Sequence, residues 1–119
     1  MLEIIKERRV IMEKIIINIA KEYTKTPGGR HISEGEFSGE DFREKILLKK
    51  AQQAIQNGNK LEVILDGGYG YAPSFLEEAF GGLMRKLMDD RLFDIISIIS
   101  EEEPKLIQDI KNYMREAKG

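Results

Sequence analysis

The sequence predicts an α/β domain in which largely parallel strands are covered by helices. Short runs rich in β-branched residues alternate with segments of helical periodicity, and turn residues separate the two. The chain has 119 residues and 41% hydrophobic content, which is the size and composition of one domain with its own core. Regular alternation of this kind favours parallel central strands, because each helix carries the chain back to the start of the next strand.

The composition excludes several classes of function. The 19 Lys and Arg residues are interspersed with 21 Asp and Glu residues, so a nucleic-acid-binding surface is not expected. The chain has no Cys and a single His, His31, which argues against a metal centre, thiolate catalysis or a His-based triad. No apolar run is long enough to span a bilayer, and the first residues are too charged for a signal peptide. We expect a soluble cytoplasmic protein without a cofactor.

The first strand and the turn after it are predicted from two short motifs. The run "KIIINIA", residues 14–20, is typical of a strand buried on both faces. The stretch "KTPGGRHI" follows, and its Pro and Gly residues predict that the chain turns back in a hairpin around Pro27 to Gly29.

A long helix is predicted over residues 38–58. Ser38 with Asp41 three residues later is an acidic form of the capping box, and Gly58 is typical of a left-handed C-terminal cap. Between these ends, apolar residues recur at helical spacing: Phe42, Ile46, Leu47, Ala51, Ala54 and Ile55.

The second half of the chain repeats the strand-helix pattern. A strand starts at Lys60, a helix at Ser74 and a third strand at Leu92. Ser74 and Glu77 form a second S-x-x-E capping box, and the apolar face of that helix comprises Phe75, Leu76, Ala79, Phe80, Leu83, Met84 and Leu87. The last helix has Pro104 as its first residue and Glu103 as its cap, with Ser100 as the alternative cap. Its apolar side comprises Leu106, Ile107, Ile110, Tyr113, Met114 and Ala117.

Residues 1–12 do not fit this scheme, so we divide the chain into an N-terminal extension, 1–12, and a domain, 13–119. The extension has some helical spacing but no cap. Two hypotheses follow: Met12 is the native start and Met1 is not, or residues 1–12 form a short helix that packs on the domain or on a second subunit.

Several motifs together resemble the STAS-like family of unknown function, small bacterial and phage proteins related to anti-sigma-factor antagonists. They are "TPGGR", "EGEFSGEDFREKIL" and "LDGGYGYAPSFLEEAFGGLMRKL", with the spacing between them, and the similarity covers roughly residues 14–117. The resemblance implies a STAS-like fold, which we expect as a mixed β-sheet of about four strands covered by three or more helices. It also implies a regulatory, non-enzymatic module that binds a protein.

The resemblance further implies a phosphorylation switch. In the antagonists, a Ser at the start of the helix after the central strand is phosphorylated by a histidine-kinase-like ATPase, and the phosphate breaks the complex. Ser74 takes that position here, so the implied partner is such an ATPase or an anti-sigma-type regulator. From the residues alone, a purely structural helix cap remains the alternative role of Ser74.

The other candidate residues surround Ser74. Asp66 ends a strand and can anchor the loop, coordinate an ion or act as a base, while Tyr69 and Tyr71 are candidate contact residues. Arg30 is a candidate for recognising a carboxylate or phosphate, and Arg43 is another. On the helix, the candidate partner-binding residues are Phe75, Glu77 and Glu78.

Two further functions remain open at this point. The Gly-rich loop after Asp66 could bind a nucleotide or another small molecule, although it lacks both common phosphate-loop patterns. A hydrolytic enzyme using Asp66 and Ser74 is the least favoured, because no base-nucleophile pair can be assembled.

Gly81 and Gly82 weaken the helix that contains them, which predicts close approach of the sheet or of a partner, and we favour the sheet.

Overall fold

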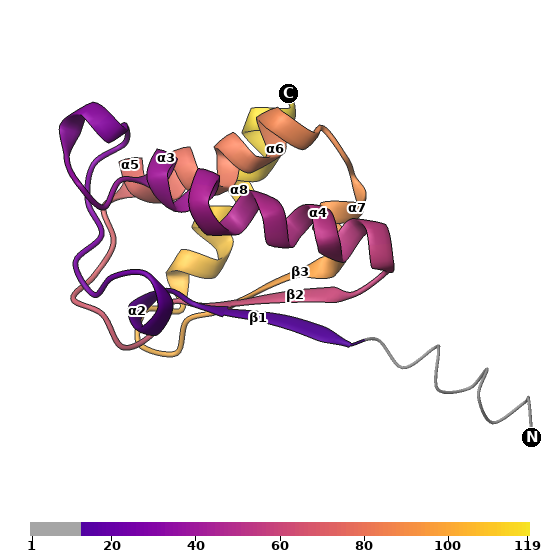
Figure 1. The fold of residues 1–119 in the computed structure, drawn as a ribbon, viewed down its shortest axis with the longest axis horizontal. Coiled ribbons are helices and arrows are strands. Elements are labelled where there is room, and N and C mark those ends of the chain that lie inside the picture. The colour runs from indigo at the N-terminus through magenta and orange to yellow at the C-terminus, as the bar shows by residue number, and fades with distance from the viewer. Residues whose placement is uncertain (1–12) are drawn as a thin grey trace, which may run out of the picture.

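The structure, a computed structural model, describes residues 13–119 as a small sheet with helices on one face (Figure 1). The three strands are β1 (Lys14–Asn18), β2 (Lys60–Ile64) and β3 (Ile96–Ile99). They lie in the order β1-β2-β3 and both pairs are parallel, with Ile17 beside Val63 and Val63 beside Ile98. The α/β class is therefore confirmed, whereas the fourth strand and the mixed sheet are not found among residues 13–119. The extension, 1–12, lies outside the described residues.

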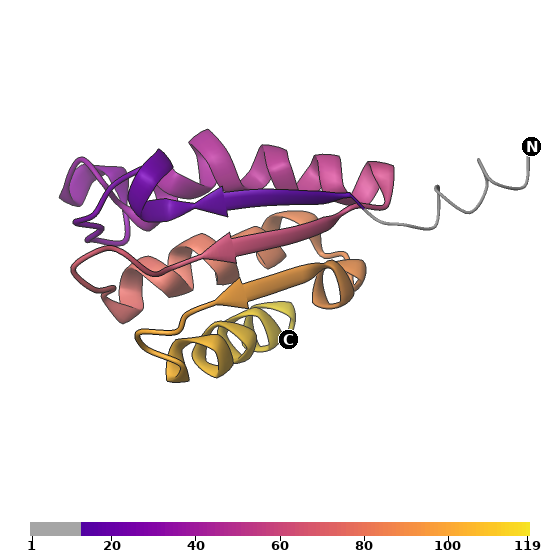
Figure 2. The same cartoon turned by 90° about the horizontal axis from the view of Figure 1, so that it is seen from below.

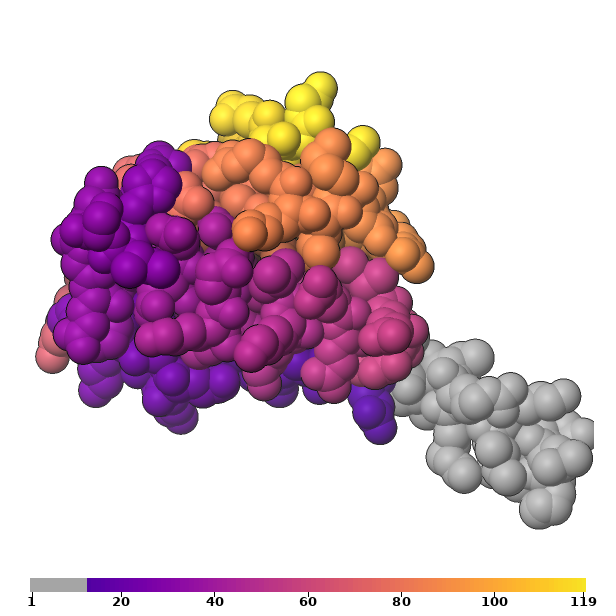
Figure 3. Space-filling model, turned by 45° about the horizontal axis from the view of Figure 1, so that its top comes forward, coloured from indigo at the N-terminus to yellow at the C-terminus, as the bar shows by residue number. Residues whose placement is uncertain are grey.

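Two long helices connect the strands, and each contains a π-helical turn. The first crossover helix runs through α3 (Gly39–Phe42), the π-helical η2 (Arg43–Leu47) and α4 (Leu48–Asn57). The second runs through α5 (Pro73–Leu76), the π-helical η3 (Glu77–Gly81) and α6 (Gly82–Leu87). The last helix is α8 (Lys105–Lys118), which packs on the second crossover helix. In the space-filling view the helices form one continuous layer (Figure 3).

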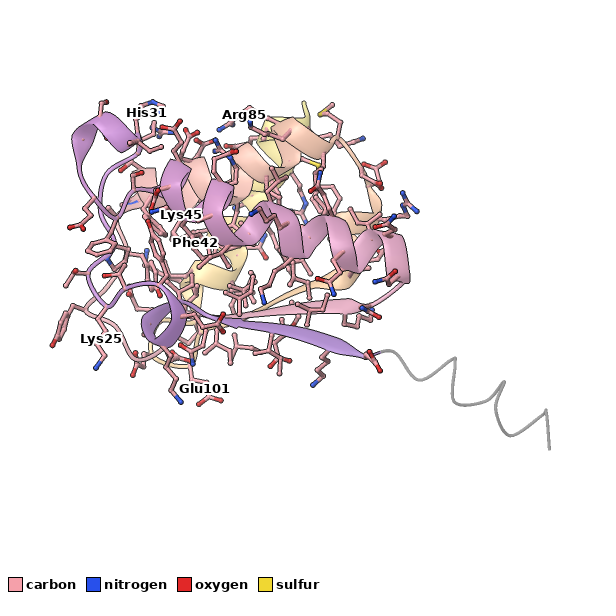
Figure 4. The ribbon with its side chains drawn as sticks, in the orientation of Figure 1. Lys25, His31, Phe42, Lys45, Arg85 and Glu101 are labelled. Carbon is pink, nitrogen blue, oxygen red and sulfur yellow. The ribbon has the colours of Figure 1, made fainter. Side chains whose placement is uncertain are left out.

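The hydrophobic core fills the space between the sheet and this helical layer. Its strand members are Ile17, Leu61, Val63 and Ile98, and Phe42, Phe75 and Phe80 come from the crossover helices. The predicted apolar faces of the second crossover helix and of α8 are confirmed, because each of their members is buried or half-buried in this cluster. Figure 4 shows Phe42 pointing from its helix toward the sheet.

The opposite face of the sheet is open within residues 13–119. Seen from that side, the strands lie in front of the long helices (Figure 2). Ile16 on this face is 47% exposed, so the prediction that the first strand is buried on both faces is wrong. A parallel sheet is usually covered on both faces. Here both strand-helix-strand connections advance in the same direction along the sheet, from β1 to β2 to β3. Because such connections have the same handedness, both helices lie on the same face of the sheet.

The predicted hairpin is also wrong. β1 ends at Asn18, whose side chain accepts a hydrogen bond from the backbone N–H of Lys21 at 3.2 Å and begins the short helix α2 (Ile19–Glu22). The chain reverses later, around the 3-10 helix η1 (Ile32–Glu34), and no strand is formed there. The backbone N–H of Gly28 then donates to the carbonyl of Phe37 at 3.0 Å.

The predicted ends of the helices have mixed outcomes. The Ser38 cap is confirmed, because its buried Oγ accepts from the N–H of Asp41 at 3.0 Å, and Gly58 has the predicted left-handed conformation. The strand predicted from Leu92 starts only at Ile96, because residues Arg91–Ile95 form the helix α7, which follows the N-cap residue Asp90. α8 starts one residue after Pro104, and the Ser100 hydroxyl donates to the carbonyl of Glu103 at 2.7 Å instead of capping an N–H.

A substitution at Gly39 tests how closely the two crossover helices must approach each other. A Cβ at Gly39 would collide with the carbonyl oxygen of Phe75, which is backbone and cannot rotate away. We therefore expect Gly39→Ala to lower the free energy of unfolding by about 1–3 kcal/mol, the usual cost of overpacking. Urea denaturation measures this change. Gly35→Ala is the control, because a Cβ at Gly35 meets nothing within 4 Å; equal stability of the two variants would contradict the packing described.

Candidate functional site

The candidate site lies where the strands end and the second crossover helix begins. We define the loop site as the β2–α5 loop (residues 65–72), Ser74, and residues 100–103, which follow β3. Because the strands are parallel, these segments lie at one end of the molecule, the end at which Figure 4 labels Lys25 and Glu101. A pocket of about 150 Å³ lies here, lined by Asp66, Tyr71 and Glu102 among others.

Asp66 anchors the loop site. Its carboxylate accepts hydrogen bonds from the backbone N–H groups of Glu101 at 3.0 Å and Glu102 at 2.8 Å. The Glu102 carboxylate in turn accepts from the N–H of Gly67 at 3.0 Å. These reciprocal bonds tie the loop after β2 to the loop after β3, so both acidic side chains have a structural role here.

The two tyrosines of the loop have different environments. The Tyr71 hydroxyl donates to the carbonyl of Leu65 at 2.8 Å, and its ring lies 5.9 Å from that of Phe75. Burial raises the pKa of Tyr71, and the negative charges of Asp66 and Glu102 add to this effect. Tyr69 is 83% exposed, although its backbone N–H donates to the carbonyl of Lys25 at 2.9 Å. The loop is thus held at several points while the Tyr69 side chain projects into solvent.

The loop does not form a phosphate cradle. The backbone N–H groups of Gly67 and Tyr69 are already bonded, to Glu102 and to Lys25. The pocket beside them is lined by Asp66, Glu102 and Glu103, which would repel a phosphate. The geometry therefore disfavours the nucleotide-binding interpretation of the Gly-rich loop.

Ser74 is not the helix cap that its S-x-x-E motif predicts. The helix begins at Pro73 with Ala72 as the N-cap, and Ser74 is the second helical residue, where its side chain makes no capping bond. The reason is that the ring of Pro73 fixes a helical φ at the first position, which moves the start one residue earlier. Because Ser74 caps nothing, the structural alternative for its role is removed, and the residue is partly exposed.

The acidic residues that follow Ser74 are neutralised by three arginines. Glu77 pairs with Arg30 and with Arg85, whose Nη1 lies 2.7 Å from Glu77 Oε2. Arg85 lies at the outer surface of the helical layer (Figure 4). Hydrogen bonds from Arg85 and Arg30 hold the pKa of Glu77 below its ordinary value, although burial acts in the opposite direction. Arg30 is therefore occupied within the fold and is not a free anion-binding residue.

Arg43 is the buried member of this network. Its Nη1 donates to both the carboxylate and the backbone carbonyl of Glu78, each at 2.7 Å, and its Nε donates to Glu44 at 2.9 Å. The Arg43 side chain is 6% exposed and that of Glu78 is 13% exposed. A Cβ at Gly82 would collide with the Arg43 guanidinium, so Gly82 makes room for the other crossover helix and not for the sheet, contrary to prediction. From the sequence, Arg43 is recognisable only as a candidate for binding a carboxylate or phosphate.

Within residues 13–119 no group of His, Cys, Asp and Glu is arranged to hold a metal ion. No helix in the same part of the chain is long and apolar enough to cross a membrane.

Comparisons with known proteins identify one family. A family model described as a STAS-like domain of unknown function matches residues 38–106. This range begins at the Ser38 cap, includes the loop site and both crossover helices, and ends at Leu106 in α8. Comparisons with curated proteins and with solved structures gave no match.

A double-mutant cycle tests the contact between Arg43 and Gly82. Arg43→Met leaves Glu78 without its buried partner, so we expect the free energy of unfolding to fall by about 3 kcal/mol. Gly82→Ala alone should destabilise through its collision with Arg43, but in the Arg43→Met background it should be neutral or stabilising, because Ala favours helix by about 1 kcal/mol. Urea denaturation of the four proteins gives the coupling energy, and additive effects would contradict this contact. Lys49→Met is the control, at an exposed position of α4.

The same network predicts a pH dependence. Burial raises the pKa of Glu78, but hydrogen bonds from Arg43 and Arg30 lower it by more, so the pKa lies below its ordinary value of 4.5. The contribution of Glu78 to stability is fully present above its pKa in the unfolded state. It is lost as pH falls through its lower pKa in the folded state. Between about pH 6 and pH 3 we therefore expect Glu78→Gln to lose less stability than the wild type. The exposed Glu116→Gln variant should follow the wild type, and parallel pH curves for all three proteins would refute the assignment.

Proposed function

Because the chain belongs to the STAS-like domain family of unknown function, we propose that it is a non-enzymatic regulatory module that binds a protein through its loop site. The observation that carries the proposal is the exposed side chain of Tyr69 on a loop fixed by hydrogen bonds that Asp66 accepts and that Gly67 and Tyr71 donate. Tyr is enriched among residues that dominate binding energy, and a loop that is already ordered loses little entropy on binding. A partner would contact Tyr69 together with the start of the second crossover helix, including Ser74.

We further propose that phosphorylation of Ser74 ends this interaction. A phosphate on the second residue of a helix lies at the positive end of the helix dipole, which favours it. Repulsion from Glu77 and Glu78 is the main objection, and their pairing with Arg30, Arg43 and Arg85 reduces it. The phosphate would add about −1.5 to −2 charge to the loop site, which already contains the carboxylates of Asp66 and Glu102. A partner docked there would be expelled unless it supplied compensating Lys or Arg residues.

The partner class rests on the family resemblance. In related antagonists the kinase is a histidine-kinase-like ATPase, and an anti-sigma-type regulator is the corresponding binding partner. We therefore place the nucleotide on the partner and none on this chain.

The test uses purified protein and candidate histidine-kinase-like ATPases from the same organism. Intact-mass spectrometry after incubation with ATP should show addition of one phosphoryl group to the wild type and none to Ser74→Ala. In binding experiments by calorimetry, Ser74→Ala should retain the partner and Ser74→Glu should lose it. Tyr69→Ala should weaken binding by about tenfold or more, the effect of losing an interfacial anchor. Equal affinity of the two Ser74 variants would rule out the switch.

Met88→Ala is the matched control for Tyr69→Ala. Met88 is another large exposed side chain, at 56% exposure. It lies at the C-terminal end of the second crossover helix, directly after α6. Both variants should keep the wild-type melting temperature, because neither side chain is part of the core. If Met88→Ala and Tyr69→Ala weaken the complex equally, the binding surface is not the loop site.

A further inference from the structure

A second surface lies away from the loop site, between β3 and the later part of α8. It is a narrow apolar groove of about 130 Å³, which we call the β3–α8 groove. Its apolar lining comprises Phe93, Ile96, Ile98, Ile110 and Met114. None of these residues belongs to the loop site or to the arginine network, so the groove requires its own explanation.

Two cations line the groove without a carboxylate partner. Lys111 and Arg115 are exposed and lie one helical turn apart on α8. Among residues 13–119, neither forms a salt bridge, and Arg115 donates only to the Asn112 side chain, at 3.4 Å. Two like charges at this spacing destabilise a helix by about 0.2–0.5 kcal/mol. The other two lysines of α8 are paired, Lys105 with Asp109 and Lys118 with Asp90. These two unpaired cations therefore make the groove a suitable site for an anionic group.

The backbone of β3 also has hydrogen-bonding groups beside the β3–α8 groove. The N–H of Leu65 donates to the carbonyl of Ile99 at 2.8 Å, so Ser97 and Ile99 direct their backbone groups toward β2. Because alternate residues of a strand point to opposite edges, the N–H and C=O of Ile98 point away from β2, on the edge beside the groove. Within the described chain, β2 is the only strand that pairs with β3. Ile98 thus has one backbone donor and one acceptor without a strand partner.

The size of the groove decides between two classes of occupant. Small-molecule sites usually enclose about 300–1,000 Å³, well above the volume seen here. A single aliphatic side chain fits this volume, and strand addition to a sheet edge combines main-chain hydrogen bonds with such side-chain pockets. We propose that the β3–α8 groove is a second protein-binding surface, which accepts an extended segment of a partner. That segment pairs with Ile98, inserts an apolar side chain into the groove and places an acidic side chain, two residues away, against Lys111 and Arg115.

A labelled peptide tests the proposal on the full chain. The probe is fluorescein-Thr-Val-Thr-Leu-Thr-Glu-Thr-amide, in which Val, Leu and Glu share one face of an extended chain. Fluorescence polarisation should show saturable binding, about tenfold weaker for Arg115→Glu and for a peptide with Lys in place of Glu, because each change puts like charges together. Lys49→Glu is the control, since it makes the same charge change at an exposed position on α4. Amide hydrogen exchange by NMR should show slower exchange of the Ile98 N–H when peptide is bound.

Several results would overturn the proposal. Equal peptide binding by Arg115→Glu and Lys49→Glu would exclude the paired cations, and unchanged exchange at Ile98 during saturation would exclude strand addition. Perturbation of Phe93 and Met114 resonances by hexanoate, with no binding of the peptide, would assign the groove to a small carboxylate. Protection of Ile98 that rises with protein concentration alone would assign it to a second copy of the chain. Tyr69→Ala should leave peptide binding unchanged, so failure of the proposed function and failure of this proposal are distinguishable.

Discussion

The buried ion pair between Arg43 and Glu78 is the interaction on which the rest of the structure depends. A guanidinium that is almost fully buried is tolerated only when its donors are satisfied, and Arg43 donates to Glu44 and to two oxygens of Glu78. Arg43 opens one π-helical turn and Glu78 lies in the other, so the pair joins the two crossover helices at their widest turns. Gly82 is required beneath the guanidinium, and Gly39 is required where the same helices meet again. Packing of the helical layer is therefore fixed by a charged contact as well as by the core.

This network also sets the electrostatics of the loop site. Glu77 and Glu78 would otherwise place two negative charges one turn from Ser74, but their charges are balanced by arginines from three segments of the chain. The pocket on the other side of the loop keeps the charges of Asp66 and Glu102, whose oxygens are used to hold backbone N–H groups. The second crossover helix thus begins two residues after Tyr71, which lines the acidic pocket, and continues into the balanced acidic cluster. At such a position the proposed phosphate would be tolerable to the fold, while it would change the surface offered to the proposed partner.

The sequence was informative where structure depends on neighbours along the chain. The Ser38 cap, the Gly58 stop and the apolar faces of the helices follow from local spacing, and the family resemblance followed from contiguous motifs. It failed where two local signals competed, as at Ser74, where the adjacent Pro73 set the helix start. It also could not reveal the contact of Arg43 with Glu78, because 35 positions separate them and nothing in either local motif specifies the partner. The π-helical turns were also not predicted, because they cause no large change in the spacing of the apolar residues.

The connectivity of the sheet explains where the two proposed binding surfaces lie. Strand order β1-β2-β3 advances in one direction, so both crossover helices lie on one face and the carboxyl ends of the strands gather their loops at one end. A fold whose strand order reversed would place helices on both faces and enclose the sheet. Here α8 follows the last strand and packs on the second crossover helix, which leaves the outer edge of β3 without a strand partner in the described chain. The loop site and the β3–α8 groove are therefore two consequences of the same topology, one at the ends of the strands and the other along the last of them.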